Sequence, residues 1–257
     1  MRDRLADRTS ALEHAKDQLI ARAAADPSAV AAWPGGAVEG LAAFLRRYYR
    51  HVAPEDLVGR RVEQILAAAM AHRDLAVSRP QGTASVRVRT PEGEGHSVVE
   101  VVCDDMPFLV DSVTAELSRH GRAIHLVIHP QLVVRRDVTG RLLDICDAST
   151  AADAGPDCAD AVVESWMHVD IDRETDSDER TALVADLERV LRDVREAVED
   201  WPKMQSIALR LADEITDAPP AGLPAQEVTE ACDLLRWLAD AHFTFLGYRE
   251  NALAAGE

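Results

Sequence analysis

Apolar side chains recur at helical spacing through the first part of the chain. The helices predicted from this spacing cover residues 3–24, 37–52 and 54–77. Pro27 ends the first helix, because the residue before a proline is disfavoured in the α conformation. Pro54 suits the first turn of the third helix. We therefore expect residues 1–80 to form a small helical module.

From residue 84 onward, apolar and polar positions alternate, which is typical of half-buried strands. Predicted strands cover 84–90, 97–103, 123–129 with a continuation past Pro130 to 134, 142–145, 162–171 and 243–248. Predicted helices cover 107–120, 178–200 with a resumption after Pro202 to about 217, and 225–241. Residues 147–160 are rich in Ala, Asp, Gly and Ser and are expected to form a surface loop.

The order strand, helix, strand, strand, helix over 97–200 is that of a ferredoxin-like fold lacking one strand. The missing edge strand is either 84–89 or 243–248, and the pattern does not decide between them. The predicted fold class is α+β, an antiparallel sheet with its helices on one face, preceded by the helical module. The expected domains are 1–80, 81–218 for the α+β part, and 219–257 as a helix and strand leading into a following domain.

Composition favours a soluble, cytoplasmic protein. Of 257 residues, 47% are hydrophobic and 28% charged. Because no run of about 18 apolar residues occurs, we expect no membrane span. The charged N-terminus lacks the apolar core of a secretory signal. The cysteines are widely spaced and are expected to be reduced thiols: Cys103, Cys146, Cys158 and Cys232.

The formal net charge of −17 is unevenly distributed. Residues 1–80 carry 12 basic and 10 acidic side chains, whereas residues 140–200 carry 6 basic and 18 acidic ones. An acidic chain repels phosphates, so we expect no nucleic-acid partner. The basic and aromatic stretch 46–51 is then expected to dock on another part of a larger protein.

The acidic stretch 104–112 leads from a predicted strand into a predicted helix. A helix start offers free backbone N–H groups, which hold small anionic ligands readily. Asp105 is expected to cap this helix, because Asp is favoured at the N-cap, and cation binding by Asp104 and Asp105 is the alternative. The candidate effector or interface residues here are Asp104, Asp105, Met106, Pro107, Phe108, Asp111 and Ser112.

Two histidines join these candidates. His125 and His129 are four residues apart on one predicted strand, so their side chains are expected on the same face. With His168 on a neighbouring strand they could form a metal or proton-sensing cluster. The interpretation we favour is that they are hydrogen-bonded polar residues on a half-exposed sheet face, with no metal.

The sequence contains no recognisable reaction centre. No Gly-x-Gly-x-x-Gly follows a strand, and no phosphate-binding Gly-x-x-x-x-Gly-Lys-Ser/Thr occurs. The two lysines, Lys16 and Lys203, lie in predicted helices without nearby glycine. We therefore predict that this chain is not catalytic and holds no cofactor itself.

Three motifs carry a resemblance to a known family. The stretch Asp105–Val113, the pair His129-Pro130 and the stretch Phe243–Tyr248 resemble the N-terminal region of the large bacterial NAD-specific glutamate dehydrogenases. The resemblance covers roughly residues 30–257 and implies the first of several ACT-type regulatory domains ahead of a catalytic domain. Many ACT domains bind amino acids or other small effectors and carry a glycine in the first strand–helix corner. This chain has no glycine from Asp104 to Ser112.

The resemblance also implies a function. The full-length enzyme would convert L-glutamate, water and NAD to 2-oxoglutarate, ammonium and NADH, and this region would sense an amino-acid effector or hold a homo-oligomer together. Its partners would be its own downstream domains and neighbouring subunits. A stand-alone amino-acid-binding module and a ligand-free structural segment are the alternatives.

Overall fold

The computed structural model describes residues 2–148 and 150–251 and divides into two compact units. The first unit ends at Arg192 and the second begins at Asp193, inside one long helix. Sequence patterning placed the boundaries at residues 80 and 218 instead. The helical module and the sheet belong to one unit because they share a single hydrophobic core.

The helical module of the first unit is helical as predicted, with two further short helices between residues 27 and 36. Its helices are α1 (Arg2–Ala24), α2 (Pro27–Ala32), η1 (Pro34–Gly36), α3 (Val38–Tyr48), α4 (Pro54–Val58) and α5 (Val62–Leu75). The single helix expected over 54–77 is in fact two helices. The second of them starts anew because the Gln64 side chain accepts a hydrogen bond from the backbone N–H of Arg61, which satisfies a donor at the helix start.

The sheet has six antiparallel strands in the order β1-β2-β6-β4-β5, with β3 also paired to β6. They are β1 (Ser85–Arg89), β2 (His96–Asp104), β3 (Ile124–Ile128), β4 (Gln131–Arg136), β5 (Leu142–Ile145) and β6 (Val162–Asp172). Strand β1 is the edge strand that completes the ferredoxin-like plan, so the first of the two options is correct. The strand expected to run through Pro130 is divided there into β3 and β4, because proline lacks the N–H that a continuous ladder needs.

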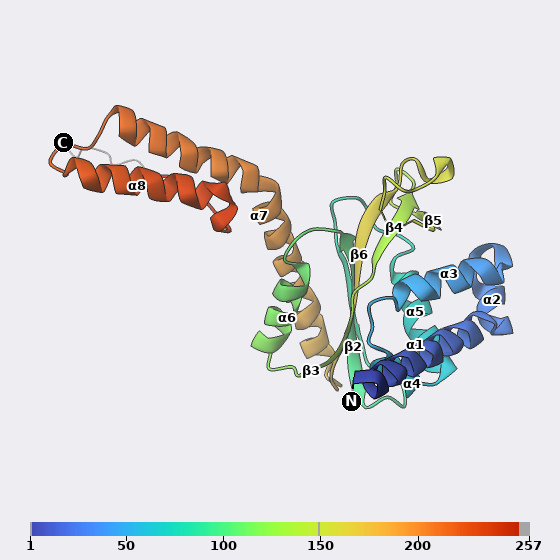
Figure 1. Cartoon of the computed structure of the whole chain (residues 1–257). Coiled ribbons are helices and arrows are strands. Elements are labelled where there is room, and N and C mark those ends of the chain that lie inside the picture. The colour runs from blue at the N-terminus through green and yellow to red at the C-terminus, as the bar shows by residue number, and fades with distance from the viewer. Residues whose placement is uncertain (1, 149, 252–257) are drawn as a thin grey trace. The chain divides into compact units, whose positions relative to one another are not determined.

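Both faces of the sheet are covered (Figure 1). Helix α6 (Leu109–Arg119) and the first part of α7 (Ser177–Asp217) lie on one face, as the sequence predicts for the α+β domain. The helical module lies on the opposite face, which the sequence did not predict. One core joins the module's Leu41, Phe44, Leu45 and Tyr48 to Val102, Ile128, Leu132 and Trp166 of the sheet.

The second unit contains the rest of α7, helix α8 (Ala225–Trp237) and a π-helical turn, η3 (Leu238–His242). Helix α7 continues through Pro202. The expected strand 243–248 is wrong, because these residues pair with no strand of the described chain and alternation alone does not hold an isolated strand extended. No helix in the described part of the chain combines the length and apolar character that crossing a bilayer requires.

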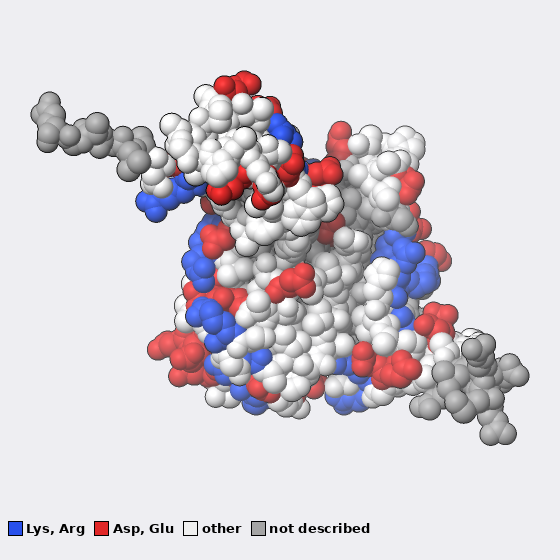
Figure 2. Space-filling model, turned by 60° about the vertical axis from the view of Figure 1, so that its left-hand side comes forward, with Lys and Arg blue, Asp and Glu red and all other residues white. Residues whose placement is uncertain are grey.

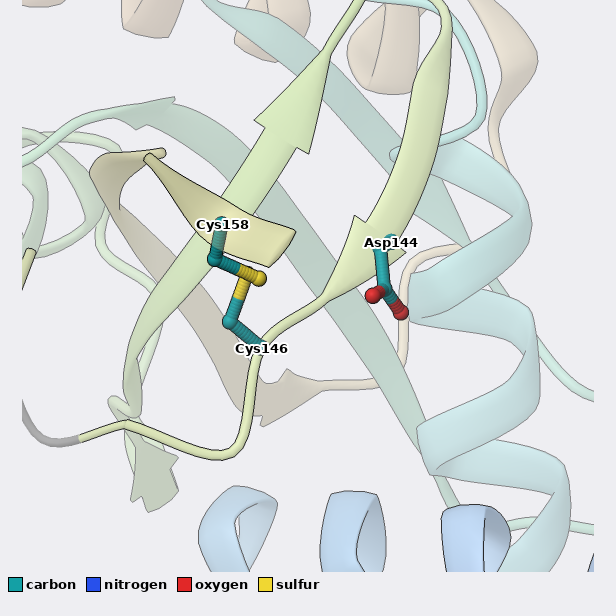
Figure 3. Close-up of side chains that lie close together, drawn as sticks. All are labelled: Asp144, Cys146 and Cys158. Atoms are coloured by element: carbon teal, nitrogen blue, oxygen red, sulfur yellow. A yellow bond between two sulfur atoms is a disulfide. The ribbon is translucent and has the colours of Figure 1, made fainter. Parts of the chain in front are cut away.

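A disulfide joins Cys146, just after β5, to Cys158 in η2 (Pro156–Cys158) (Figure 3). This corrects the expectation of four thiols; Cys103 and Cys232 are buried and form no disulfide. The two Cα atoms are 6.5 Å apart, although the cysteines are separated by 12 positions in the sequence. The carboxylate of Asp144 lies close to both sulfurs, but sulfurs bonded to each other are not the thiolates that metals require.

We expect reduction of this disulfide to lower the free energy of unfolding by about 3 kcal/mol, because it constrains the unfolded chain. Urea denaturation with and without dithiothreitol measures the effect. The double variant Cys146→Ser, Cys158→Ser should have the same free energy of unfolding as the unmodified chain with its disulfide reduced. Adding reductant should not change that free energy. A midpoint of the unmodified chain that reductant leaves in place would contradict the prediction.

Candidate functional site

The turn between β2 and α6 has an unusual backbone. Phe108 occupies the N-cap position of α6 with φ 69° and ψ 3°, in the left-handed region. This conformation costs a non-glycine residue roughly 1–2 kcal/mol. Phe108 is 38% exposed, so part of this residue faces solvent. The turn thus holds an aromatic side chain at the surface in a costly backbone conformation, a feature that clusters at functional sites.

Asp105 does not cap α6, which corrects the sequence prediction: the N-cap residue is Phe108, and no side chain caps the helix. The Asp105 carboxylate instead accepts a hydrogen bond from Gln131 Nε2 at 2.9 Å, and its backbone N–H donates to the carbonyl of Val163. Asp104 forms an ion pair with Arg79 at 2.6 Å. Both carboxylates therefore tie the end of β2 to neighbouring strands and loops.

The remaining residues of the turn complete the predicted set. Met106 and Ser112 are half-buried, while Pro107 and Asp111 are exposed. The backbone N–H of Ser112 donates to the carbonyl of Phe108 at 3.0 Å, so α6 is regular from its first turn. We define residues 104–112 as the corner.

The two predicted histidines do not share a face. His125 is exposed and its Nε2 lies 2.9 Å from the Asp172 carboxylate. His129 lies one residue beyond β3, and its Nε2 is hydrogen-bonded to Ser165 Oγ. Burial lowers the pKa of His129, and the nearby Asp105 carboxylate partly opposes that shift. The spacing argument failed because β3 is irregular near His125 and ends before His129.

The sheet face beneath the helical module carries titratable groups, of which the sequence had singled out only His168. Every one of these side chains is almost completely buried: Glu100, Glu164, His168 and Asp170. The only sequence feature that could have identified these residues is their spacing, because they alternate with apolar residues along β2 and β6. Alternation of this kind predicts a solvent-facing surface, and only the covering module makes it an interior one.

Glu164 is the most enclosed of these groups. Arg79, itself fully buried, contacts it at 2.5 Å, and Arg136 binds both of its oxygens. Trp166 Nε1 also donates to it at 3.0 Å. Burial would raise the pKa of Glu164, but the hydrogen bonds and charges of Arg136 and Arg79 outweigh it and hold the pKa below its usual value.

A second group of charges lies toward the start of β2. Glu100 is paired with Arg87 at 2.7 Å and Arg89 at 3.1 Å. Asp170 accepts from Arg60 at 2.8 Å and from His168 Nε2 at 2.9 Å. Despite its burial, these partners lower the pKa of Asp170 to about 2, so both carboxylates are charged at neutral pH.

His72 on α5 completes this buried face. It is fully buried, with Nδ1 2.8 Å from Tyr48 Oη and Nε2 3.0 Å from the carbonyl of Val101. Because burial disfavours the imidazolium, the pKa of His72 falls to about 3.

Another titratable cluster lies between α6 and α7. Glu116, His120 and Asp186 approach one another closely enough to share a cation. However, Arg119 contacts both Glu116 and Asp186, and Arg189 contacts both as well. These guanidinium groups already neutralise the carboxylates, so the arrangement is an ion-pair network between two helices.

We expect stability to fall on acidification because of His72. Its pKa is about 3 when folded and about 6.5 when unfolded, so between these values the unfolded state binds the proton. The free energy of unfolding should fall by about 1.4 kcal/mol per pH unit for this one group. Asp170 contributes only below its usual pKa of about 4.

Urea denaturation between roughly pH 6 and pH 4.5 checks this prediction. The variant His72→Gln should show a slope shallower by that amount, whereas His14→Gln, on the exposed side of α1, should match the unmodified chain. His129 titrates in all three proteins and cancels in the comparison. Equal slopes for the two variants would exclude the assigned role of His72.

Comparison with known proteins adds family information to this geometry. The family model described as "Glutamate dehydrogenase, ACT1 domain" matches residues 44–187. The chain is 34% identical over 215 residues to the NAD-specific glutamate dehydrogenase of Halomonas elongata, covering 80% of this chain and 13% of that protein. It is 34% identical over 217 residues to the enzyme of the same name from Pseudomonas aeruginosa, covering 82% and 13%.

A third relative is more distant. The NAD-specific glutamate dehydrogenase of Mycobacterium tuberculosis is 32% identical over 197 residues, covering 75% of this chain and 12% of that protein. The chain therefore spans about an eighth of the length of the curated relatives that it matches.

Proposed function

Because the chain belongs to the glutamate dehydrogenase ACT1-domain family, we propose that it is the N-terminal regulatory and assembly region of an NAD-dependent glutamate dehydrogenase. The complete enzyme would oxidise L-glutamate with NAD and water to 2-oxoglutarate, ammonium and NADH in the cytoplasm. The partners of this region would be the downstream domains, neighbouring subunits and an amino-acid effector, with neither nucleic acid nor a membrane involved.

The observation that carries the proposal is the left-handed Phe108 at the corner. A costly backbone conformation at a partly exposed aromatic residue supports a functional role for the ring, because such residues cluster at functional sites. Asp104 and Asp105 hold the corner in place through Arg79 and Gln131. A bound effector or a neighbouring subunit would meet the ring and the helix start together.

Surface charge supports a protein or small-molecule partner over a nucleic acid. On the face shown in Figure 2, basic and acidic side chains are interspersed, without one continuous basic area. Binding along a nucleic acid backbone would require such an area.

We expect this chain by itself not to oxidise L-glutamate. All strand pairings in the described part of the chain are antiparallel, whereas dinucleotide sites lie at parallel strand ends beside a glycine-rich turn. Its residues therefore do not fit NAD, and Lys16 is buried, donating to the carbonyl of Val52 at 2.7 Å. Absorbance of NADH should stay at background when the chain is mixed with NAD and L-glutamate, and turnover that scales with its concentration would contradict this.

The regulatory role is tested by Phe108→Gly in the full-length enzyme. Glycine adopts the left-handed conformation freely but gains entropy when unfolded, so stability should change by less than about 1 kcal/mol. We expect an altered L-glutamate saturation curve, an altered thermal response to amino acids, or an altered mass by light scattering. Ser112→Ala tests hydrogen bonding at the same helix start.

Ala241→Gly is the matched control, because Ala241 is the other non-glycine residue with positive φ in the described chain, at 56°. It makes the same backbone change far along the sequence. A changed mass with unchanged kinetics would assign assembly to the corner. Identical behaviour of the Phe108 and Ala241 variants would leave the corner without a functional role.

A further inference from the structure

A small pocket lies at the end of β2 opposite to the corner, between α5, the β1–β2 turn and β6. Its volume is about 60 Å³, and it is open to solvent. The polar residues that line it are Arg60, Gln64, Arg89, Glu94, His96 and His168. A pocket of this size holds a few water molecules or one small polar group.

One lining group is buried without a partner. His168 is 1% exposed, and its Nδ1 has no hydrogen-bond partner within the described chain. The other ring nitrogen, Nε2, lies 2.9 Å from the Asp170 carboxylate, which can only accept, so Nε2 carries a proton. Leaving Nδ1 unpaired costs free energy, and a bound group with a matching atom would recover it.

Two guanidinium groups in the pocket have donors to spare. Arg60 uses Nη2 for Asp170 and Nε for the carbonyl of Asp56. Arg89 uses Nε and Nη2 for Glu100. Neither Nη1 has a hydrogen-bond partner among residues 2–148 and 150–251. Both side chains remain about a quarter exposed, at 28% and 26%.

The spare hydrogen-bond donors of the lining favour an anion. Glu94 is the one carboxylate that lines the pocket, and its Oε1 accepts a hydrogen bond from Gln64 at 3.0 Å. Asp170 is paired with Arg60, and Glu100 is paired with both Arg87 and Arg89, so these carboxylates are compensated and leave the Nη1 donors of Arg60 and Arg89 available. Spare guanidinium donors bind carboxylate and phosphate oxygens with charge-assisted hydrogen bonds.

We propose that this pocket binds a small oxyanion, a carboxylate or phosphate group, between Arg60, Arg89 and His168. The Nη1 atoms of the two arginines donate to its oxygens. A proton on Nδ1 of His168 would be donated to an oxygen of either group, whereas an unprotonated Nδ1 accepts only from the hydroxyl of a hydrogen phosphate. The site joins the helical module, through Arg60, to the sheet, through Arg89 and His168, so the ligand bridges both layers.

Isothermal titration calorimetry of the chain with sodium phosphate, sodium acetate and glycine tests the site, with chloride keeping ionic strength constant. We expect saturable one-to-one binding of at least one probe. Binding of phosphate alone assigns a phosphate group, binding of acetate as well assigns any oxyanion, and binding of glycine alone assigns an amino-acid carboxylate. Absence of saturable binding by all three overturns the proposal.

Variants locate the binding. Arg60→Gln and Arg89→Gln should each weaken the affinity about tenfold, which corresponds to one lost charge-assisted hydrogen bond. Arg50→Gln, an exposed arginine of the same module, should leave it unchanged. Saturable binding that all three variants retain equally would place the anion elsewhere and overturn the proposal.

If the variants fail to fold, NMR spectroscopy of the unmodified chain provides a second test. The ring ¹⁵N signals of the unmodified chain report directly on the imidazoles, and one Nδ1 signal should shift saturably with the bound probe while that of exposed His14 stays constant. Uniform shifts of all histidines would contradict the site. Because the corner is not involved, this result is independent of the Phe108 experiment.

Discussion

The pairing of Glu164 with Arg79 and Arg136 is the interaction on which the rest of this structure depends. Arg79 follows the last helix of the module, Glu164 lies on the central strand β6 and Arg136 on β4. Removing one partner would leave a buried charge uncompensated, which costs about 3–5 kcal/mol. The helical module therefore cannot move away from the sheet without breaking an ion pair, and the module and sheet form one unit.

Patterning along the chain predicted most elements, because strands and helices here have one apolar face each. It could not predict what covers the second face of the sheet. Glu100 and Asp170 have the period-two positions of solvent-facing residues, yet both are buried, and arginines more than ten residues away in sequence compensate their charges: Arg60, Arg87 and Arg89. Charged residues at alternate strand positions are compatible with a solvent-exposed sheet face and with a buried one. The sequence alone could not decide between these two environments.

At the corner, contacts with residues distant in sequence override the helix-capping preference of Asp105. Asp105 has the residue type and position of a helix cap. Its side chain instead accepts a hydrogen bond from Gln131, and its backbone N–H donates to the carbonyl of Val163. The left-handed Phe108 then takes the N-cap position. For the histidines, the irregular β3 and the break at Pro130 defeated the spacing argument. The partners of Asp105 and His129 lie on β4 and β6, which are distant from them in sequence, so local sequence rules could not identify these contacts.

The corner and the anion pocket lie at opposite ends of β2, which is paired with β6 along its whole length from His96 to Asp104. A sheet of this kind carries a signal only if some element has two discrete arrangements. The left-handed backbone at Phe108 costs roughly 1–2 kcal/mol, and coupling free energies between sites are of similar size.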